Sequence, residues 1–355
     1  MQTDWGSKRI LVTGGASFIG SHLVELLLEK GAKTILVVDD LSSGRLDNLR
    51  DAKETGRVEF IKADLLASGV ANAVVRDIDV VFHLAAIHGG RGYVDLHQAA
   101  CARNLAMDGL AIHASYIAGV KKFVLASSVC VYPNYVQRDA TKELYLTEEM
   151  AGPPFDADNL YGWAKLMAEM TLKAYYREYG FKSASCRFFT VYGERGVENH
   201  AVMAMIGRAF IGQNPFEVWG DGTQIRNWTY VRDIVAGMVL AAETVEDASA
   251  INLGTMERTQ VIDAVHEVLR YTGHKAEIKL RPDMPTGPVN RVASNALAAR
   301  VLGWQPKVSF IEGLHRTTDW YFGTKNRREV ERTLEFLLTE RPADADLILV
   351  EADAK

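Results

Sequence analysis

The sequence predicts an α/β fold, in which helices cover both faces of a doubly wound parallel sheet and a smaller α/β lobe follows towards the C-terminus. Three observations support this prediction. Short apolar runs alternate with segments of helical apolar spacing through the first half of the chain, which is the pattern of βαβ units. A glycine-rich turn joins the first run to the first helix. After about Thr190, Gly and Pro become more frequent and the elements shorter.

The predicted elements alternate in order along the chain. Apolar runs predict strands at residues 10–13, 34–38, 58–61, 79–82, 122–126 and 183–188. Helical spacing predicts helices at 18–30, 96–118 and 160–179, each followed by a glycine. We expect a dinucleotide-binding Rossmann domain at 1–190, a substrate lobe at 191–325, with more than one crossing of the chain between them, and a charged extension at 326–355. One surface helix, around 328–338, and a frayed tail are expected in that extension.

Composition places the chain among ordinary globular proteins. Apolar residues make up 48% and charged residues 24%, which excludes intrinsic disorder, collagen and coiled coil. The net charge is −5, so general binding to nucleic acid is not expected. Three cysteines and no secretory leader predict a reduced, cytoplasmic protein. The apolar stretches are shorter than the ~20 residues that span a bilayer, so no membrane association is expected.

The first predicted strand leads into the turn T-G-G-A-S-F-I-G, from Thr13 to Gly20. Gly14 permits a tight turn, Gly20 lets the helix approach the strand, and amides at the helix start can hold a diphosphate. Ser17 stands where a further glycine is expected, so its Cβ is predicted to adjust the site. Asp39 closes the second strand, suits a 2′,3′-ribose diol and repels a 2′-phosphate, which favours NAD over NADP.

Tyr161 and Lys165 are four residues apart at the start of a predicted helix, so they share one of its faces. An ammonium beside a phenol favours the phenolate, which can take a proton from a sugar hydroxyl. Ser127 and Ser128 end the fifth strand at the same edge of the sheet. We therefore expect Ser128 to hydrogen-bond the reacting oxygen while Tyr161 acts as the base.

Over about residues 8 to 325, these motifs resemble the extended short-chain dehydrogenase/reductase family, and within it the nucleotide-sugar epimerases, dehydratases and reductases. F-H-L-A-A, from Phe82 to Ala86, and W-G-D-G, from Trp219 to Gly222, match as well. The resemblance implies an NAD-dependent enzyme that forms a homodimer through the helices at 96–118 and 160–179. No histidine spacing points to a metal site. The cofactor-binding residues that the resemblance implies are Gly14, Ser17, Phe18, Ile19, Gly20, Asp39, Asp64, Leu65, Leu84, Ala85, Ala86, Asn104, Tyr161 and Lys165.

Two arginines of the second lobe resemble the diphosphate clamp of nucleotide-sugar enzymes. Arg226 lies in G-T-Q-I-R-N-W and Arg291 in G-P-V-N-R-V-A, and guanidinium groups suit bidentate contact with phosphate. The loop from Ile87 to Gly92 resembles a double-glycine substrate loop. The substrate-binding residues so implied are Gly89, Gly90, Ser128, Thr190, His200, Arg226 and Arg291.

Cys130 follows Ser128 by two residues, which places both side chains on one side of an extended strand end. Its context, S-S-V-C-V-Y-P, resembles GDP-mannose 3,5-epimerases and GDP-L-fucose synthases, in which a cysteine here serves as an acid/base group. His200 resembles the histidine that the fucose synthases pair with it. In this interpretation Tyr161 and NAD oxidise C4 of the sugar, the 4-ketone acidifies C3 and C5, and Cys130 and His200 transfer the protons. The catalytic residues expected are Ser128, Cys130, Tyr161, Lys165 and His200.

The expected function is redox-neutral epimerisation of a nucleotide-diphosphate sugar, most similar to the GDP-mannose 3,5-epimerases. Three alternatives remain. R-F-F-T-V-Y-G, from Arg187 to Gly193, carries Thr190 and resembles UDP-glucuronate 4-epimerases, so a UDP-hexose or UDP-hexuronate 4-epimerase is the first. The second is a 3,5-epimerase/4-reductase acting on GDP-4-keto-6-deoxymannose, which would consume NAD(P)H. The third is a non-catalytic NAD-binding regulator.

Overall fold

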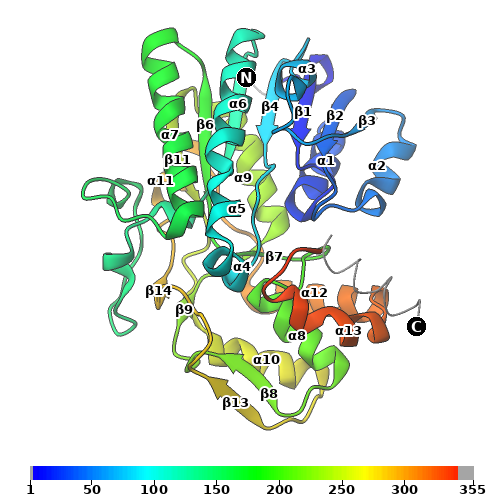
Figure 1. Ribbon diagram of the computed structural model, residues 1–355, viewed down its shortest axis with the longest axis vertical. Helices are drawn as coiled ribbons and strands as arrows, with labels where there is room; N and C mark the ends of the chain where they lie inside the picture. Colours follow the sequence, from blue (N-terminus) through cyan, green and yellow to red (C-terminus); the bar gives the residue numbers. More distant parts are fainter. Residues whose placement is uncertain (1–2, 343–355) are drawn as a thin grey trace.

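The computed structural model of the protein describes residues 3–342 (Figure 1). At its centre lies a seven-stranded sheet in the order β3-β2-β1-β4-β5-β6-β11, and all neighbouring strands are parallel. The chain runs outwards from β1 to β3 and then returns to β4, so the strand order reverses between β1 and β4. This doubly wound order confirms the predicted fold class. The strands are β1 (Arg9–Thr13), β2 (Thr34–Asp39), β3 (Val58–Lys62), β4 (Val80–His83), β5 (Lys122–Ser128), β6 (Ser183–Phe188) and β11 (Asp247–Leu253).

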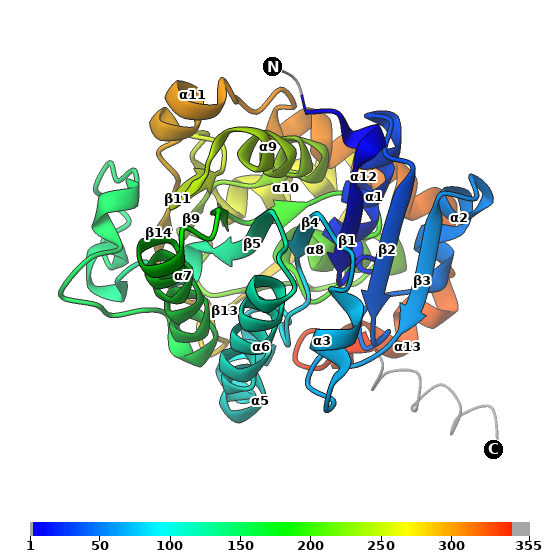
Figure 2. The same cartoon turned by 90° about the horizontal axis from the view of Figure 1, so that it is seen from above.

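Helices cover both faces of this sheet, as the view from above shows (Figure 2). Ile10 and Val12 of β1 belong to the buried cluster on one face and Leu11 to the cluster on the other, so this strand is apolar throughout. One face carries α1 (Phe18–Glu29) and α9 (Val231–Thr244), and the other α3 (Val70–Val74), α6 (Asn104–Ile117) and α7 (Asn159–Tyr179). The short helix α2 (Arg50–Glu54) precedes β3.

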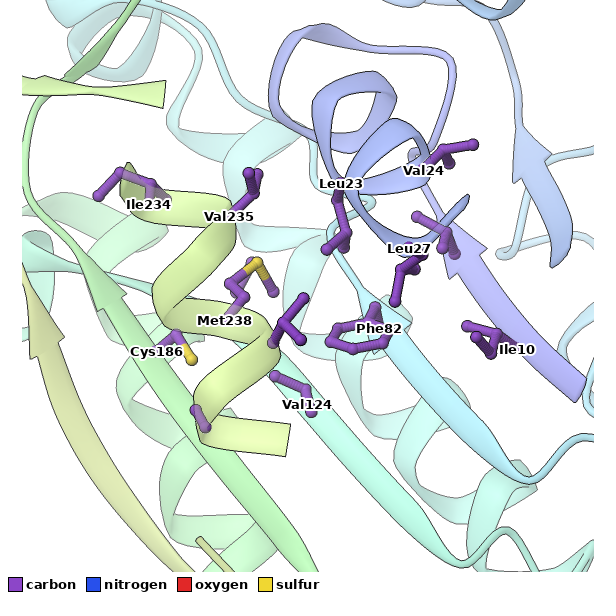
Figure 3. Close-up of a cluster of buried hydrophobic side chains, with 14 of the residues drawn as sticks. Ile10, Leu23, Val24, Leu27, Phe82, Val124, Cys186, Ile234, Val235 and Met238 are labelled. Atoms are coloured by element: carbon purple, nitrogen blue, oxygen red, sulfur yellow. The ribbon is translucent and has the colours of Figure 1, made fainter. Parts of the chain in front are cut away.

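The core between the sheet and the pair α1 and α9 is closely packed (Figure 3). Leu27 of α1 and Met238 of α9 are fully buried there with Phe82 of β4. Removing the Leu27 side chain beyond Cβ should lower the free energy of unfolding by about 2–5 kcal/mol, because the surrounding side chains can only partly fill the space. This packing holds the carboxyl ends of the strands, where the site lies, in a fixed relation.

The single helix predicted at 96–118 is instead divided. The structure has α4 (Arg91–Leu96), α5 (Gln98–Ala102) and then α6. Between α4 and α5, the backbone of His97 departs from helical geometry with ψ 51°. At the start of α6, the Asn104 side chain donates to the carbonyl oxygen of Cys101 at 2.9 Å. That bond competes with the regular helical hydrogen bonds. The prediction of one helix was therefore wrong.

The second lobe has its own buried core, made by short strands, three helices of the lobe and the helix α13 (Arg327–Leu337) that follows them. The chain leaves this lobe to form α9 and β11 in the central layers, within the range 191–325, and α11 (Ala296–Leu302) packs against them. The helices of the lobe are α8 (Ala201–Ile211), α10 (Val261–Thr272) and α12 (Phe310–Thr324). The strand pairs are β7 (Val191–Tyr192) with β10 (Thr229–Tyr230), β8 (Phe216–Trp219) with β13 (Ile278–Arg281), and β9 (Ile225–Arg226) with both β12 (Thr259–Gln260) and β14 (Asn290–Arg291).

The helix expected near 328–338 is α13 (Arg327–Leu337), and it is not a detached surface helix. Its apolar side chains Val330, Leu334 and Leu337 are buried, and it packs against α8. The tail expected beyond residue 342 lies outside the described residues. Across the part of the chain that the structure does describe, none of the helices combines the length and the apolar character needed to cross a bilayer.

Candidate active site

One cavity of about 450 Å³ runs from the carboxyl ends of the central strands to the second lobe. It begins at the glycine turn after β1 and ends beside strands of the lobe. Two of the expected site residues, Asn104 and Lys165, are buried and do not form part of its wall. The expected residues that line it are Gly14, Ser17, Phe18, Ile19, Gly20, Asp39, Asp64, Leu65, Leu84, Ala85, Ala86, Gly89, Gly90, Ser128, Cys130, Tyr161, Thr190, His200, Arg226 and Arg291.

Two glycines of the turn after β1 are sterically required. Gly14 has φ +69°, and a Cβ there would lie 2.8 Å from the amide nitrogen of Ala85. A Cβ at Gly20 would lie 2.2 Å from the carbonyl oxygen of Gly14, so α1 can approach β1 only where this side chain is missing. The first amides of a helix have no partner within it, and those of α1 lie at the cavity wall. This arrangement fits the diphosphate of a dinucleotide.

Asp39 faces the cavity at the end of β2 and is held by its neighbours. It accepts hydrogen bonds from the amides of Ala16 at 3.0 Å and Leu41 at 2.8 Å, and from the Ser17 hydroxyl at 3.2 Å. Burial raises the pKa of Asp39, and these donors oppose that effect. A Cβ at Gly44 would lie 2.8 Å from its carboxylate, so the loop after β2 closes against it. The site fits a ribose diol, and Ser17 positions the carboxylate.

Tyr161, in the first turn of α7, lines the cavity with Ser128 at the end of β5. Burial raises the pKa of Tyr161, the charges of Cys130 and Asp108 raise it further, and a hydrogen bond with Ser128 lowers it. The sequence had suggested that Lys165 would favour the phenolate, and the structure differs. Lys165 Nζ lies 3.3 Å from both carboxylate oxygens of Asp108, so the ammonium is paired with a carboxylate.

Asp108 of α6 connects Lys165 to a buried hydrogen-bond chain. It also accepts from His83 Nε2 at 3.0 Å, and His83 Nδ1 lies 2.8 Å from the hydroxyl of Thr13. Burial alone would raise the pKa of Asp108, but Lys165 and His83 bring it below its usual value. His83 is thus a structural residue within this buried hydrogen-bond chain. Asp108 itself was missed because nothing in the sequence pairs it with Lys165.

Asn104 was expected to contact the cofactor, but its side chain does not line the cavity. Its side-chain oxygen accepts from the amide of Ile87 at 2.8 Å, and its amide nitrogen donates to the carbonyl oxygens of Ile87 and Cys101. The side chain is fully buried and satisfied by backbone groups. Asn104 therefore holds the loop after β4, and the predicted cofactor contact is replaced by this role.

Cys130 lines the middle of the cavity from a 3-10 turn, Val129–Val131, rather than from an extended strand end. The turn forms because the hydroxyl of Ser128 accepts from the amide of Cys130 at 3.1 Å. The Sγ atom lies 3.7 Å from Nη1 of Arg291. Burial raises the pKa of the Cys130 thiol, and the charge of Arg291 partly offsets this. At pH 7 the group is a neutral thiol.

His200, the residue before α8, lies beside a histidine that the sequence analysis did not assign to the site. The rings of His200 and His88 are stacked with centroids 5.4 Å apart, and the His88 ring is 4.8 Å from that of Tyr161. Burial lowers the pKa of His200 to about 4. Burial also lowers the pKa of His88 to about 3, and the charges of His200 and Lys165 contribute to that effect. Both imidazoles are neutral at pH 7. His88 was considered only as a metal ligand, which is why it was missed.

Three arginines meet towards the lobe end of the cavity. Arg226 of β9 and Arg291 of β14 are direct partners in a parallel ladder, which brings two distant segments side by side. Asp158 accepts from Arg291 and from Arg91, both at 2.8 Å. Burial and the charges of Arg291 and Arg91 lower the pKa of Arg226 to about 9. Such a cluster favours an anion with more than one charge, and Arg91 stands in the double-glycine loop already noted.

Beyond these arginines, the cavity contains buried polar groups without partners. Nε and Nη2 of Arg208 have no hydrogen-bond partner among the described residues, although Glu335 lies 4.0 Å from Nη2. Gln224 Oε1 is likewise unpartnered there, and both residues are buried and line the cavity beside Trp219. Within residues 3–342, no group of three or more His, Cys, Asp or Glu side chains is placed to hold a metal ion.

Comparison with known proteins places this geometry among NAD-dependent enzymes. Residues 10–254 match the model of the NAD dependent epimerase/dehydratase family. The chain is 30% identical over 336 residues to GDP-mannose 3,5-epimerase 1 of Oryza sativa subsp. indica, covering 93% of this chain and 85% of that protein.

Solved structures of epimerases are similar over most of the chain. UDP-glucose 4-epimerase of Thermus thermophilus in complex with NAD has a TM-score of 0.78 and 28% identity, covering 89% of this chain and 100% of that one. UDP-glucuronic acid 4-epimerase of Bacillus cereus, in complex with UDP-glucuronic acid and NAD, has a TM-score of 0.78 and 29% identity, covering 88% and 98%.

Proposed function

The chain belongs to the NAD-dependent epimerase/dehydratase family, and from that premise we propose that it epimerises a nucleotide-diphosphate sugar in the manner of the GDP-mannose 3,5-epimerases. The observation that carries this proposal is that Cys130 and His200 line the same cavity as Ser128 and Tyr161. Inversion at C4 needs only the group around Tyr161. Inversion at C3 and C5 also needs groups that remove and return carbon-bound protons, and this cavity contains two.

Tyr161 carries out the proton transfer at the C4 hydroxyl, and Ser128 hydrogen-bonds the sugar oxygen. NAD, when bound, supplies the acceptor and the donor of the C4 hydride. Tyr161 is protonated at pH 7 in the structure, because burial and the nearby acids raise its pKa. The positive charge of an oxidised cofactor is the kind of neighbour that would favour its phenolate. Tyr161 then takes the hydroxyl proton as the 4-keto sugar forms and returns it at the end of the cycle.

The charge states of Cys130 and His200 at pH 7 suggest how they divide the proton transfers. A neutral imidazole can take a proton, and a neutral thiol can give one. We assign to His200 the removal of protons made acidic by the 4-ketone, and to Cys130 their replacement from the other side of the ring. The stacked His88 limits the movement of the His200 ring.

The lobe end of the cavity favours guanine as the base. Nε and Nη2 form one edge of the Arg208 guanidinium, and this edge is buried and unpartnered among the described residues. It matches the adjacent O6 and N7 acceptors of guanine, while Gln224 Oε1 matches an N–H donor of the same base. Uracil has no such pair of adjacent acceptors. The cluster of Arg91, Arg226 and Arg291 would then hold the diphosphate of a GDP-sugar.

A UDP-hexuronate 4-epimerase is the second candidate, because Thr190 lines the cavity as well. The candidates differ in proton exchange with solvent. Turnover in D₂O with GDP-mannose and UDP-glucuronate, followed by NMR and mass spectrometry, separates them. We expect deuterium at C3 and C5 of the GDP-sugar, with no net consumption of NAD(P)H.

Replacement of Cys130 by serine should lower this exchange by about 10²-fold or more, since a positioned acid or base contributes that much. Cys186→Ala, in the core on the α9 side of the sheet, is the matched control and should keep it. Epimerised product without deuterium would identify a 4-epimerase. Net NAD(P)H consumption would identify a 3,5-epimerase/4-reductase, and lack of turnover of either substrate would favour a non-catalytic regulator.

We also propose that two copies associate through α6 and α7. Large apolar side chains are exposed on both helices, each at 37% or more: Leu105, Leu110, Ile117, Trp163 and Met167. Exposed apolar side chains on two neighbouring helices are typical of an interface. Light scattering after gel filtration should give twice the chain mass, and Met167→Glu should reduce it to that of one chain.

A further inference from the structure

Residues 327–341, which we call the C-terminal strap, consist of α13 and the turn that follows it, and they lie beyond residues 10–254 that match the family. The strap is attached at several points. Leu334 and Leu337 of α13 are buried. Helix α4 leaves room for it, because a Cβ at Gly92 would lie 2.5 Å from the carbonyl oxygen of Leu338. Glu340 Oε1 is 3.0 Å from His97 Nε2. The strap is therefore part of the cavity's structure.

Arg341, at the end of the strap, crosses the cofactor side of the cavity. Its Nη2 donates to the hydroxyls of Ser42 and, at 3.3 Å, Ser43, in the loop after β2. It is also close enough to the loop after β4 for its charge to help lower the pKa of His88. In the sheet, β1 lies between β2 and β4. Arg341 and the glycine turn that follows β1 line the same cavity.

On the side of the cavity around this turn, Arg341 is the cationic side chain among the described lining residues that could pair with a bound anion. The acids Asp39, Asp40 and Asp64 line this side of the cavity. Of the arginines and lysines among the described lining residues, Arg91, Arg208, Arg226 and Arg291 belong to the substrate side, and the remaining one is Arg341. Its Nε atom is buried and has no hydrogen-bond partner among residues 3–342. A buried donor without a partner among these residues thus belongs to a side chain that lines the same cavity as the start of α1.

We propose that Arg341 binds the diphosphate of NAD from the side opposite the α1 amides, so that the C-terminal strap retains the cofactor. Arginine suits this contact because its planar fork can bond two phosphate oxygens. NAD can then leave only after Arg341 has released it. The proposal depends on NAD binding and not on the sugar that the enzyme converts, so it can fail or succeed independently of the proposed function.

The test follows NADH leaving the holoenzyme, measured by the fall in its fluorescence when excess ADP-ribose is added. Arg341→Gln should increase the dissociation rate about tenfold or more, as expected for the loss of a charge-assisted hydrogen bond. Arg341→Lys keeps the charge and should lie between this variant and the wild type. Arg328→Gln removes an exposed arginine of the same strap and should leave the rate unchanged.

Competition by ADP-ribose and by adenosine separates a phosphate contact from a general effect on the fold. Arg341→Gln should weaken ADP-ribose binding about tenfold and adenosine binding less than twofold. Unchanged ADP-ribose binding would overturn the proposal. An equal loss for both ligands would overturn it too, because the strap would then act only on the shape of the site. Ser42→Ala, which removes an acceptor of Arg341, gives a second and milder variant with the same expected pattern.

Discussion

The two ends of the cavity are each suited to a diphosphate, and they achieve this by different means. On the cofactor side, the anion site is made by backbone amides of contiguous residues, Gly14 to Gly20, next to the acid Asp39. On the substrate side it is made by the side chains of Arg91, Arg226 and Arg291, which come from separate segments. The amides add no net charge, whereas the guanidinium groups repel one another until Asp158 or an anion compensates them.

This difference explains how a chain with net charge −5 can hold two anionic ligands. On the proposed cofactor side, Asp39 can accept hydrogen bonds from a ribose diol. The proposed substrate side is locally cationic and suits a charged group. Substitutions that affect one side and not the other are therefore the clearest way to test the comparison.

The largest effect is expected from Gly20→Ala. A Cβ would lie 2.2 Å from the carbonyl oxygen of Gly14, so the start of α1 must move and its amides lose their alignment. NAD affinity, measured by calorimetry, should fall about 100-fold, and stability by about 1–3 kcal/mol. Gly323→Ala, where a Cβ would meet nothing within 4 Å, is the control. Unchanged NAD affinity in Gly20→Ala would contradict the role given to the backbone.

Arg291→Met should affect the other side alone. It removes one guanidinium from the substrate side and leaves Asp158 with Arg91, so GDP affinity should fall about 10- to 100-fold. NAD affinity should change less than twofold. Arg232→Met, at an exposed position on α9, serves as the control. A parallel loss of NAD binding would show that the two sides are not independent.

Asp108→Asn extends the comparison to Tyr161, because the buried Asp108 does not line the cavity but acts on that phenol through its charge. Its negative charge raises the pKa of Tyr161, so its removal should lower that pKa. Since activity needs the phenolate, the limb on which activity rises with pH should shift to lower pH by about one unit. The measurement is kcat against pH with saturating substrate. A shift towards higher pH would contradict the effect on Tyr161 that is assigned to Asp108.

The smallest effect concerns stability in acid. The pKa of His200 is lowered to about 4 by burial, from an unfolded value of about 6.5. Between pH 4 and pH 6.5 the unfolded chain binds a proton at this histidine and the folded chain does not. The contribution of His200 to the free energy of unfolding is therefore fully present above pH 6.5 and is lost as the pH falls towards 4. His200→Gln should reduce this loss by about 1–3 kcal/mol in urea titrations. The exposed His113→Gln should not alter it.

Much of the fold could be predicted because its signals are local. The apolar runs of β1 to β6 and the glycine turn each depend on a few consecutive residues. The division of the helix predicted at 96–118 was missed, since the Asn104 side chain that marks it is bonded to Ile87 of another element. The seventh strand, β11, was also missed, because it joins the sheet from within the range assigned to the second lobe.

The candidate site divides in the same way. Gly14, Gly20 and Asp39 were predictable, because their roles follow from backbone conformation and from spacing along one βαβ unit. Cys130 and His200 were found through the resemblance of their sequence contexts. His88, Asp108 and Arg341 were not found, because their neighbours are distant in the chain: His88 with His200, Asp108 with Lys165, and Arg341 with Ser42.

The sequence by itself determined the doubly wound sheet, the glycine turn and the acid at the end of β2, because each depends on residues that are close together in the chain. Only the tertiary structure decided the charge states in the cavity. Whether Lys165 is paired with a carboxylate, whether His200 is neutral and where Arg341 lies depend on burial and on partners brought together by folding. Electrostatic effects depend on distance in space, and spacing along the chain does not report that distance.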